Sequence, residues 1–121
     1  MDGDLTEGRS LRWRSVTTLA ERSRRDCREF DPEAATPADA VGEGIEPLLT
    51  EYVRCRREDV RLSSVERSLL EGALNDWLRA YAATRGLPTF EGTAFSVHEL
   101  AIEYARTGET AAAVRHLFSE R

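Results

Sequence analysis

The chain has no lysine and no glutamine, and among its 121 residues it has only one asparagine (Asn75) and two isoleucines (Ile45 and Ile102). Lysine is normally among the commonest residues of soluble proteins, so its complete absence reflects a bias. Residues with AT-rich codons are depleted together, which indicates a GC-rich genome. Arginine supplies all 17 basic residues against 22 acidic ones, and the net charge of −5 fits a salt-adapted (halophile) cytosol or, alternatively, a high-GC soil bacterium.

Long apolar runs are also missing. No run approaches the roughly 20 residues that span a bilayer, and the acidic residues 1–4 lack the basic and then apolar layout of a secretory signal. The only cysteines are Cys27 and Cys55, and one pair in a non-secreted chain is usually reduced and buried. We therefore predict a cytoplasmic protein with no membrane partner, and the length predicts a single helical domain over 1–121.

Charge is distributed in blocks along the chain. Residues 9–28 contain seven arginines against Glu21 and Asp26, and residues 31–51 contain six acidic residues and no arginine. Residues 52–67 are again rich in arginine. One interpretation is that neighbouring blocks neutralise one another across a helical bundle. The other is that arginine-rich helix faces meet phosphate or an acidic partner.

Apolar residues recur at helical spacing, and no segment alternates with the period of a strand. The expected helices cover residues 5 or 10–30, 37–42, 46–60, 64–85, 97–107 and 110–118, and four of them begin with capping residues, Thr36, Ser63, Ser96 and Thr110. Gly42 and Gly44 are expected to break the helix at 37–42. Residues 31–44 are therefore predicted to form a flexible acidic connection.

The helix at about 64–85 is the most hydrophobic one and carries apolar residues on more than one side. A helix of this kind is usually central, with neighbours on two sides. The sequence therefore predicts an all-α fold, a compact bundle of about five helices around this central hydrophobic helix, with a C-terminal αα-hairpin.

The patterns that carry catalysis are missing as well. The two cysteines with His98 and His116 make a nominal zinc set, but structural zinc sites use close ligand pairs, and here each ligand comes from a different helix. No Gly-x-Ser-x-Gly turn exposes a serine, and residues 42–44 lack the third glycine and the lysine of a phosphate loop. Glu99 and Glu103 lie one turn apart but are typical of a solvated face. We predict no metal, no cofactor and no enzymatic activity.

Residues 97–118 have the shape helix, glycine-containing turn, helix. The spacing resembles that of a tetratricopeptide repeat, and it is carried by Leu100, Ala101, Tyr104, Gly108, Ala113 and Leu117. The resemblance covers about a fifth of the chain and no second repeat is present, whereas a solenoid needs several repeats. The segment is therefore interpreted as a lone αα-hairpin that closes the bundle.

The same hairpin is similar to a helix-turn-helix of bacterial regulators, in its residues 99–101 and 113–117. Its first helix is about one turn longer than in that motif, and its turn glycine comes late. This resemblance implies DNA binding over residues 97–120, with Arg115, His116 and Arg121 as the nucleic-acid-binding residues. An acidic chain must overcome repulsion from phosphates, although a local arginine face can do so.

Taken together, these patterns predict a small non-enzymatic protein-interaction or regulatory module that binds another protein or forms a homodimer. Tryptophan and arginine are the residues that most often anchor interfaces. The predicted partner-binding residues are Arg9, Arg12, Trp13, Arg24 and Arg25. The alternatives are the DNA-binding regulator just described and an enzyme with a minimal Cys–His or carboxylate site.

Overall fold

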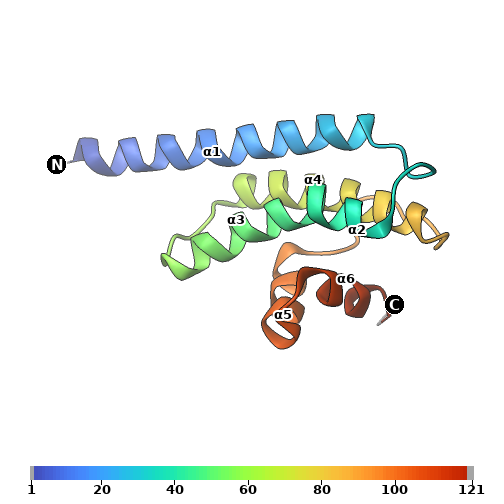
Figure 1. Cartoon of the computed structure of the whole chain (residues 1–121). Coiled ribbons are helices and arrows are strands. Elements are labelled where there is room, and N and C mark those ends of the chain that lie inside the picture. Colours follow the sequence, from blue (N-terminus) through green and yellow to red (C-terminus); the bar gives the residue numbers. More distant parts are fainter. Residues whose placement is uncertain (1, 120–121) are drawn as a thin grey trace.

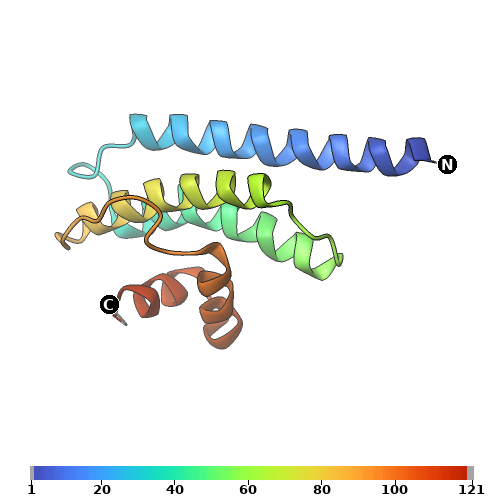
Figure 2. The ribbon, with the colours of Figure 1, turned by 180° about the vertical axis from the view of Figure 1, so that it is seen from behind.

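A computed structural model describes the backbone of residues 2–119 and the side chains of residues 12–119, and over that range it contains helices and no strand (Figure 1). The predicted all-α bundle is confirmed. The first helix, α1 (Asp2–Glu29), packs along α4 (Ser64–Thr84), and Figures 1 and 2 show that the two run in the same direction. Val16, Ala20 and Ser23 form the buried side of α1, because residues three and four apart share one face of a helix.

The break predicted at Gly42 and Gly44 is wrong. The short helix α2 (Pro37–Ala40) continues through a π-helical segment, η1 (Val41–Ile45), directly into α3 (Glu46–Arg57). A Cβ at position 44 would overlap the indole ring of Trp77, so Gly44 lets the backbone approach the ring and does not end the helix. Residues 37–44 of the predicted connection are therefore helical, and its flexibility stays a prediction.

The helix predicted to reach Val60 ends earlier, at Arg57. Asp59 adopts a left-handed backbone conformation with φ of 57°, which a right-handed helix cannot continue through. The backbone N–H of Val60 then donates to the carbonyl of Cys55 at 2.8 Å, which satisfies one of the carbonyls left free at the end of α3.

The prediction that residues 64–85 form the central helix is confirmed. Helix α4 contacts α1, α2, η1, α3 and α5. Its start has the predicted capping box, in which the Ser63 hydroxyl accepts from the N–H of Glu66 at 3.1 Å and the Glu66 carboxylate accepts from the N–H of Ser63 at 2.9 Å. Farther along, the indole N–H of Trp77 donates to the carbonyl of Ser23 at 2.9 Å and ties α4 to α1.

Residues 85–96 return the chain along α4, and the buried amide of Asn75 fixes them at Phe95. The Asn75 side chain donates to the carbonyl of Phe95 at 2.8 Å and accepts from the N–H of Phe95 at 3.0 Å. The chain then forms the predicted hairpin of α5 (Val97–Thr107) and α6 (Thr110–Ser119), joined at Gly108 with φ of 76°. Figures 1 and 2 show the hairpin on the side of α4 away from α1.

Within the described part of the chain, no helix has the length and apolar character that crossing a lipid bilayer requires.

Candidate partner-binding surface

Arg12, one of the predicted partner-binding residues, is engaged inside the fold. Its Nε lies 2.9 Å from Oε2 of Glu66, and the two side chains are 25% and 2% exposed. Glu66 also caps α4 through its other carboxylate oxygen. Arg12 therefore joins α1 to the N-terminal end of α4.

The ionisation of Glu66 follows from these contacts. Burial disfavours its charged form, but the hydrogen bonds from Arg12 and from the backbone of Ser63 outweigh burial, so the pKa of Glu66 is lowered. The carboxylate is thus held in its charged form beside the Arg12 guanidinium at neutral pH.

Arg24 has a second contact within the fold. Its guanidinium crosses α4 at Gly72, where a Cβ would overlap it, and its Nε lies 3.5 Å from Oδ2 of Asp76. The side chain remains 45% exposed. Arg24 therefore lies at the edge of the α1–α4 contact and is accessible to a partner on one side.

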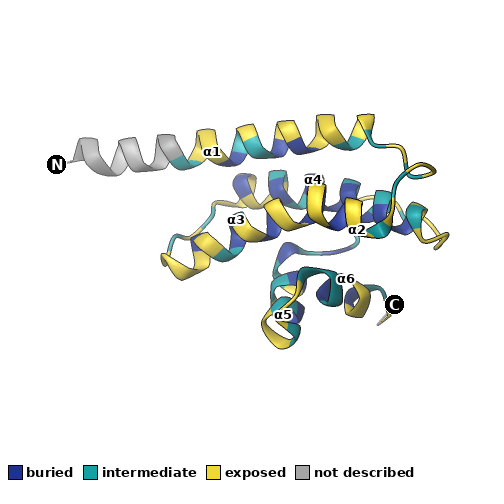
Figure 3. Cartoon of the chain, in the orientation of Figure 1, coloured by how far each residue is buried: buried dark blue, intermediate teal, exposed yellow. Residues whose placement is uncertain are grey.

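The remaining arginines of α1 point outward. Figure 3 shows this side of the helix as exposed, and it carries Arg14, Arg22, Arg25 and Arg28, which we call the arginine surface. No carboxylate within residues 12–119 forms an ion pair with any of the four. Residues 12–29 contain six arginines and three acidic residues, so this part of the helix is net positive in an otherwise acidic chain.

Within residues 12–119, the acidic block at residues 31–51 forms no ion pair with the arginines of α1. Glu51 binds Arg54 at 2.5 Å within α3, and Asp39 accepts from the backbone at the start of α2. The ion pairs that α1 makes to described residues go instead to Glu66 and Asp76 of α4. The neighbouring acidic block therefore does not neutralise the described arginines of α1 through ion pairs.

A shallow groove of about 820 Å³ separates α1 from α3 and borders the arginine surface. Arg14 and Arg22 lie on its α1 side, and Glu46 and Glu51 lie on its α3 side. Its floor includes Leu19. The groove thus offers a basic wall and an acidic wall along one strip of the surface.

Trp13 is 43% exposed and Val65 is 57% exposed. They directly adjoin the paired residues Arg12 and Glu66 in sequence, which places both at the N-terminal end of the α1–α4 contact. The side chain of Arg9, also predicted to bind a partner, lies outside the described residues. The structure thus gives an exposed tryptophan near the middle of α1 and exposed arginines farther along the same helix.

The cysteine thiols and the imidazole of His98 lie in surroundings typical of residues that stabilise a fold. Both cysteines are free, and burial is the main cause that raises the pKa of each thiol, for Cys27 to about 11. A thiol with such a pKa is protonated near neutral pH and is a weak nucleophile. His98 shares a hydrogen bond of 2.8 Å with the hydroxyl of Tyr52. Among the described residues, no group of three or more candidate ligands could hold a metal ion.

The residues proposed for nucleic-acid binding are only partly brought together. Arg115 and His116 are exposed on α6, but Nδ1 of His116 lies 3.8 Å from the Glu103 carboxylate, which also binds Arg106 at 3.3 Å. Arg121 lies outside the described residues. The rest of α6 is largely turned inward, with Ala113, Val114 and Leu117 buried.

Residues 10–115 match a protein family described as Domain of unknown function (DUF8055). The chain belongs to this family. The matched residues include α4 and the arginine surface, and they end within α6. No curated protein and no solved structure matches the chain.

Proposed function

We propose that this domain is a small, non-enzymatic interaction module of the cytoplasm, whose arginine surface binds an acidic segment of a partner protein. One observation carries the proposal. The arginines of α1 that face α4 are paired with carboxylates, whereas the four outward ones have no ion pair to any described residue although the chain is net acidic. Free guanidinium groups are left available on an exposed helix face.

Arginine is well suited to this task. Its planar guanidinium donates in a fork that matches a carboxylate, and it is more weakly hydrated than the ammonium of lysine. Arg14 to Arg28 span 14 residues of helix, or roughly 21 Å at 1.5 Å per residue, so an extended or helical acidic segment can meet several of them. Trp13, at 43% exposure, precedes Arg14 and lies about 100° round the helix from it, so it offers an aromatic anchor beside the strip.

The surroundings of the reactive side chains support a non-enzymatic role. The thiols of Cys27 and Cys55 have raised pKa values because they are buried, and the imidazole of His98 is occupied by Tyr52. None of these groups is arranged as the activated nucleophile and base that covalent catalysis uses.

Nucleic-acid binding by the hairpin has weaker support. A recognition helix needs several polar side chains that reach base edges, whereas α6 exposes Arg115 and His116, and His116 lies beside the carboxylate of Glu103. The arginine surface itself carries charge that phosphates also attract. The experiment must therefore distinguish a protein partner from nucleic acid.

The test is affinity capture from a lysate of the native cell with three baits, each with and without nuclease. The baits are the wild type, the double variant Arg22→Gln/Arg25→Gln and the matched control Arg61→Gln/Arg67→Gln. All four positions are exposed arginines without an ion pair to a described residue, so both double variants remove the same charge. We expect the same protein to be retained by the wild type and the control, to survive nuclease, and to be lost from Arg22→Gln/Arg25→Gln.

Other outcomes would overturn the proposal. Loss of the captured protein from both double variants would indicate a general charge effect. Loss on nuclease treatment would favour the nucleic-acid alternative, and retention by all three baits would remove the arginine surface from the interface. Sedimentation of the purified wild type beside Arg22→Gln/Arg25→Gln identifies the case in which the partner is a second copy of the chain, because only the wild type would then form the dimer.

A further inference from the structure

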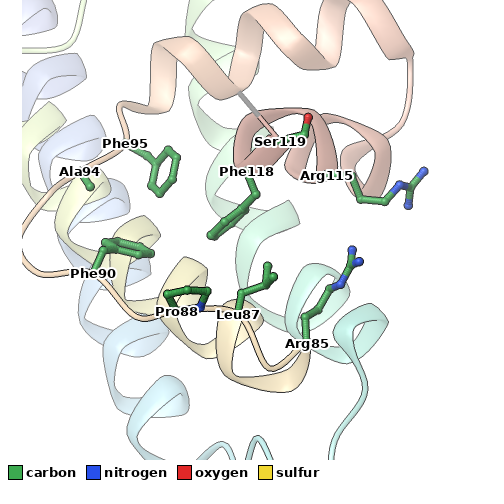
Figure 4. Close-up of a pocket in the computed structure, with 9 residues that line it drawn as sticks. All are labelled: Arg85, Leu87, Pro88, Phe90, Ala94, Phe95, Arg115, Phe118 and Ser119. Carbon is green, nitrogen blue, oxygen red and sulfur yellow. The ribbon is translucent and has the colours of Figure 1, made fainter. Parts of the chain in front are cut away.

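A pocket of about 500 Å³ lies where the chain after α4 meets α6, on residues separate from the arginine surface. Its lining is mainly apolar and aromatic, and Figure 4 shows the side chains around it. Its lining includes Arg85, Leu87, Phe90, Phe95, Arg115 and Phe118. Pockets of a few hundred cubic ångströms, lined by aromatic side chains with a few polar groups, are typical of small-molecule sites.

The walls of this pocket are held in place by contacts outside it. Asn75 fixes the backbone of Phe95 through two hydrogen bonds. Arg79 stacks over the ring of Phe90, with its guanidinium carbon 5.3 Å from the ring centre, and donates to the carbonyl of Gly92 at 2.7 Å. The apolar walls are therefore formed before any ligand arrives, and little conformational entropy needs to be lost on binding.

The three phenylalanines contact one another. The ring centres of Phe90 and Phe95 are 5.1 Å apart in an edge-to-face arrangement, and those of Phe95 and Phe118 are also 5.1 Å apart. Such pairs lie within the favourable range for aromatic contacts. Together the rings provide a firm apolar wall against which a flat molecule can pack.

Two arginines stand at the opposite end of the pocket from Phe90, as Figure 4 shows. Arg85, which follows α4, donates to the Tyr81 hydroxyl at 3.0 Å, and this bond holds its guanidinium beside the opening. Arg115 comes from α6 and forms no ion pair with a carboxylate in the described range. Two positively charged side chains from different elements therefore line one end of an aromatic pocket, and neither forms an ion pair with a described carboxylate.

We propose that this pocket binds a small organic anion, with a flat apolar body against Phe90, Phe95 and Phe118 and a single acidic group between Arg85 and Arg115. The acidic group can be a carboxylate, sulfonate or phosphate, since the guanidinium fork accommodates each of them. A purely apolar ligand would leave both arginines unused, and a simple inorganic anion would leave the aromatic wall bare. The combination selects a molecule that has both parts.

The test uses 8-anilinonaphthalene-1-sulfonate as the anionic probe and uncharged N-phenyl-1-naphthylamine as its neutral counterpart. Fluorescence titrations measure the affinity of the wild type, Arg85→Gln, Arg115→Gln and the control Arg67→Gln, which removes an exposed arginine from the other end of α4. We expect one saturable site for the sulfonate. Each pocket substitution should weaken it at least about fivefold, since each one removes a guanidinium that can donate charge-assisted hydrogen bonds to the sulfonate.

The neutral probe and a blocking variant complete the test. N-phenyl-1-naphthylamine should bind more weakly than the sulfonate and with the same affinity to Arg115→Gln as to the wild type. Ala94→Leu, which adds three carbons to the lining, should weaken both probes at least about tenfold while the melting temperature stays within a few degrees. If Ala94→Leu does not fold, amide shifts of the wild type on titration with the sulfonate give the same answer, because they should concentrate in residues 87–95 and 115–119.

The proposal would be overturned by sulfonate affinities that change less than twofold in both Arg85→Gln and Arg115→Gln. It would equally be overturned by an equal loss in Arg67→Gln, by binding without saturation, or by amide shifts away from the pocket. None of these outcomes bears on capture of a protein by α1, so the two proposals can fail separately.

Discussion

Different kinds of interaction hold the two halves of α4 against the rest of the molecule. The N-terminal half relies on a buried carboxylate, Glu66, bound by Arg12. The C-terminal half relies mainly on neutral groups, the amide of Asn75 and the ring of Trp77, which packs on Gly44. Its ion pair to α1, Arg24–Asp76, lies at the exposed edge of the contact, with side chains 45% and 33% exposed. A charged pair depends on pH, whereas an amide or a ring contact does not. The comparison therefore predicts that the N-terminal half responds to acid and that the C-terminal half carries the larger, pH-independent share of the stability.

The largest effect is expected from Asn75→Ala. The substitution leaves the buried N–H and carbonyl of Phe95 without the side chain that now binds both, and each unsatisfied buried group costs roughly 1–3 kcal/mol. We expect the free energy of unfolding to fall by about 3 kcal/mol in urea denaturation. Ser68→Ala, at an exposed position of the same helix, should stay within about 0.5 kcal/mol. Equal changes in the two variants would mean that the two hydrogen bonds from Asn75 to Phe95 do not stabilise the fold.

Gly44→Ala should be the next most damaging change. The added Cβ would overlap the Trp77 ring, so η1 must move away from α4, and overpacking of this kind typically costs 1–3 kcal/mol. Urea denaturation should show a loss of about 2 kcal/mol, and the emission of Trp77 should shift as its surroundings change. Gly42→Ala is the matched control, since nothing lies within 4 Å of a Cβ there. A Gly44→Ala variant as stable as Gly42→Ala would show that the contact with Trp77 is not tight.

Arg12→Ala tests the charged half of the comparison. Removing the guanidinium leaves the buried Glu66 carboxylate without its cation. Breaking a fully buried pair costs about 3–5 kcal/mol, and because Arg12 is 25% exposed we expect about 2 kcal/mol. Arg25→Ala, an exposed arginine of the same helix without an ion pair to a described residue, should change the stability by less than about 0.5 kcal/mol. Similar losses in both variants would remove the distinction between paired and outward arginines.

Local sequence signals predicted the helix starts, and for a physical reason. The Ser63–Glu66 capping box and Ser96 act on backbone groups three residues away, so a short stretch of sequence contains all the partners. The two glycines at 42 and 44 predict a helix break, but glycine is needed at position 44 because the backbone there contacts the ring of Trp77. Trp77 lies in α4, far along the chain, so the local sequence does not reveal this contact. The sequence likewise does not indicate which arginines of α1 form ion pairs, since their partners Glu66 and Asp76 lie in another helix.

Two features escaped the sequence analysis. Asn75 is one of several polar residues of its helix in the sequence, and its partner, the backbone of Phe95, lies 20 residues away, so no local pattern indicates the contact. The aromatic pocket takes its lining from the end of α4, from residues 87–95 and from α6, and no spacing rule links these segments. Its arginines, Arg85 and Arg115, were visible in the sequence, but their convergence depends on how Asn75 docks the connecting segment.

The smallest expected effect gives the most specific test of the two halves of α4, because only the N-terminal half should lose stability as the pH falls. The pKa of Glu66 is lowered in the folded chain, so as the pH falls below about 4.3 the unfolded chain takes up this proton first. The stabilisation from the charged pair is complete above that pH and is lost as the pH falls through the folded pKa. Glu66→Gln should cost about 1 kcal/mol at pH 7, and its deficit relative to the wild type should shrink toward pH 3, whereas the deficit of Asn75→Ala should stay constant. Urea denaturation at pH 7, 4 and 3 measures both, and a Glu66→Gln deficit unchanged at pH 3 would contradict the assignment of acid sensitivity to the N-terminal half of α4.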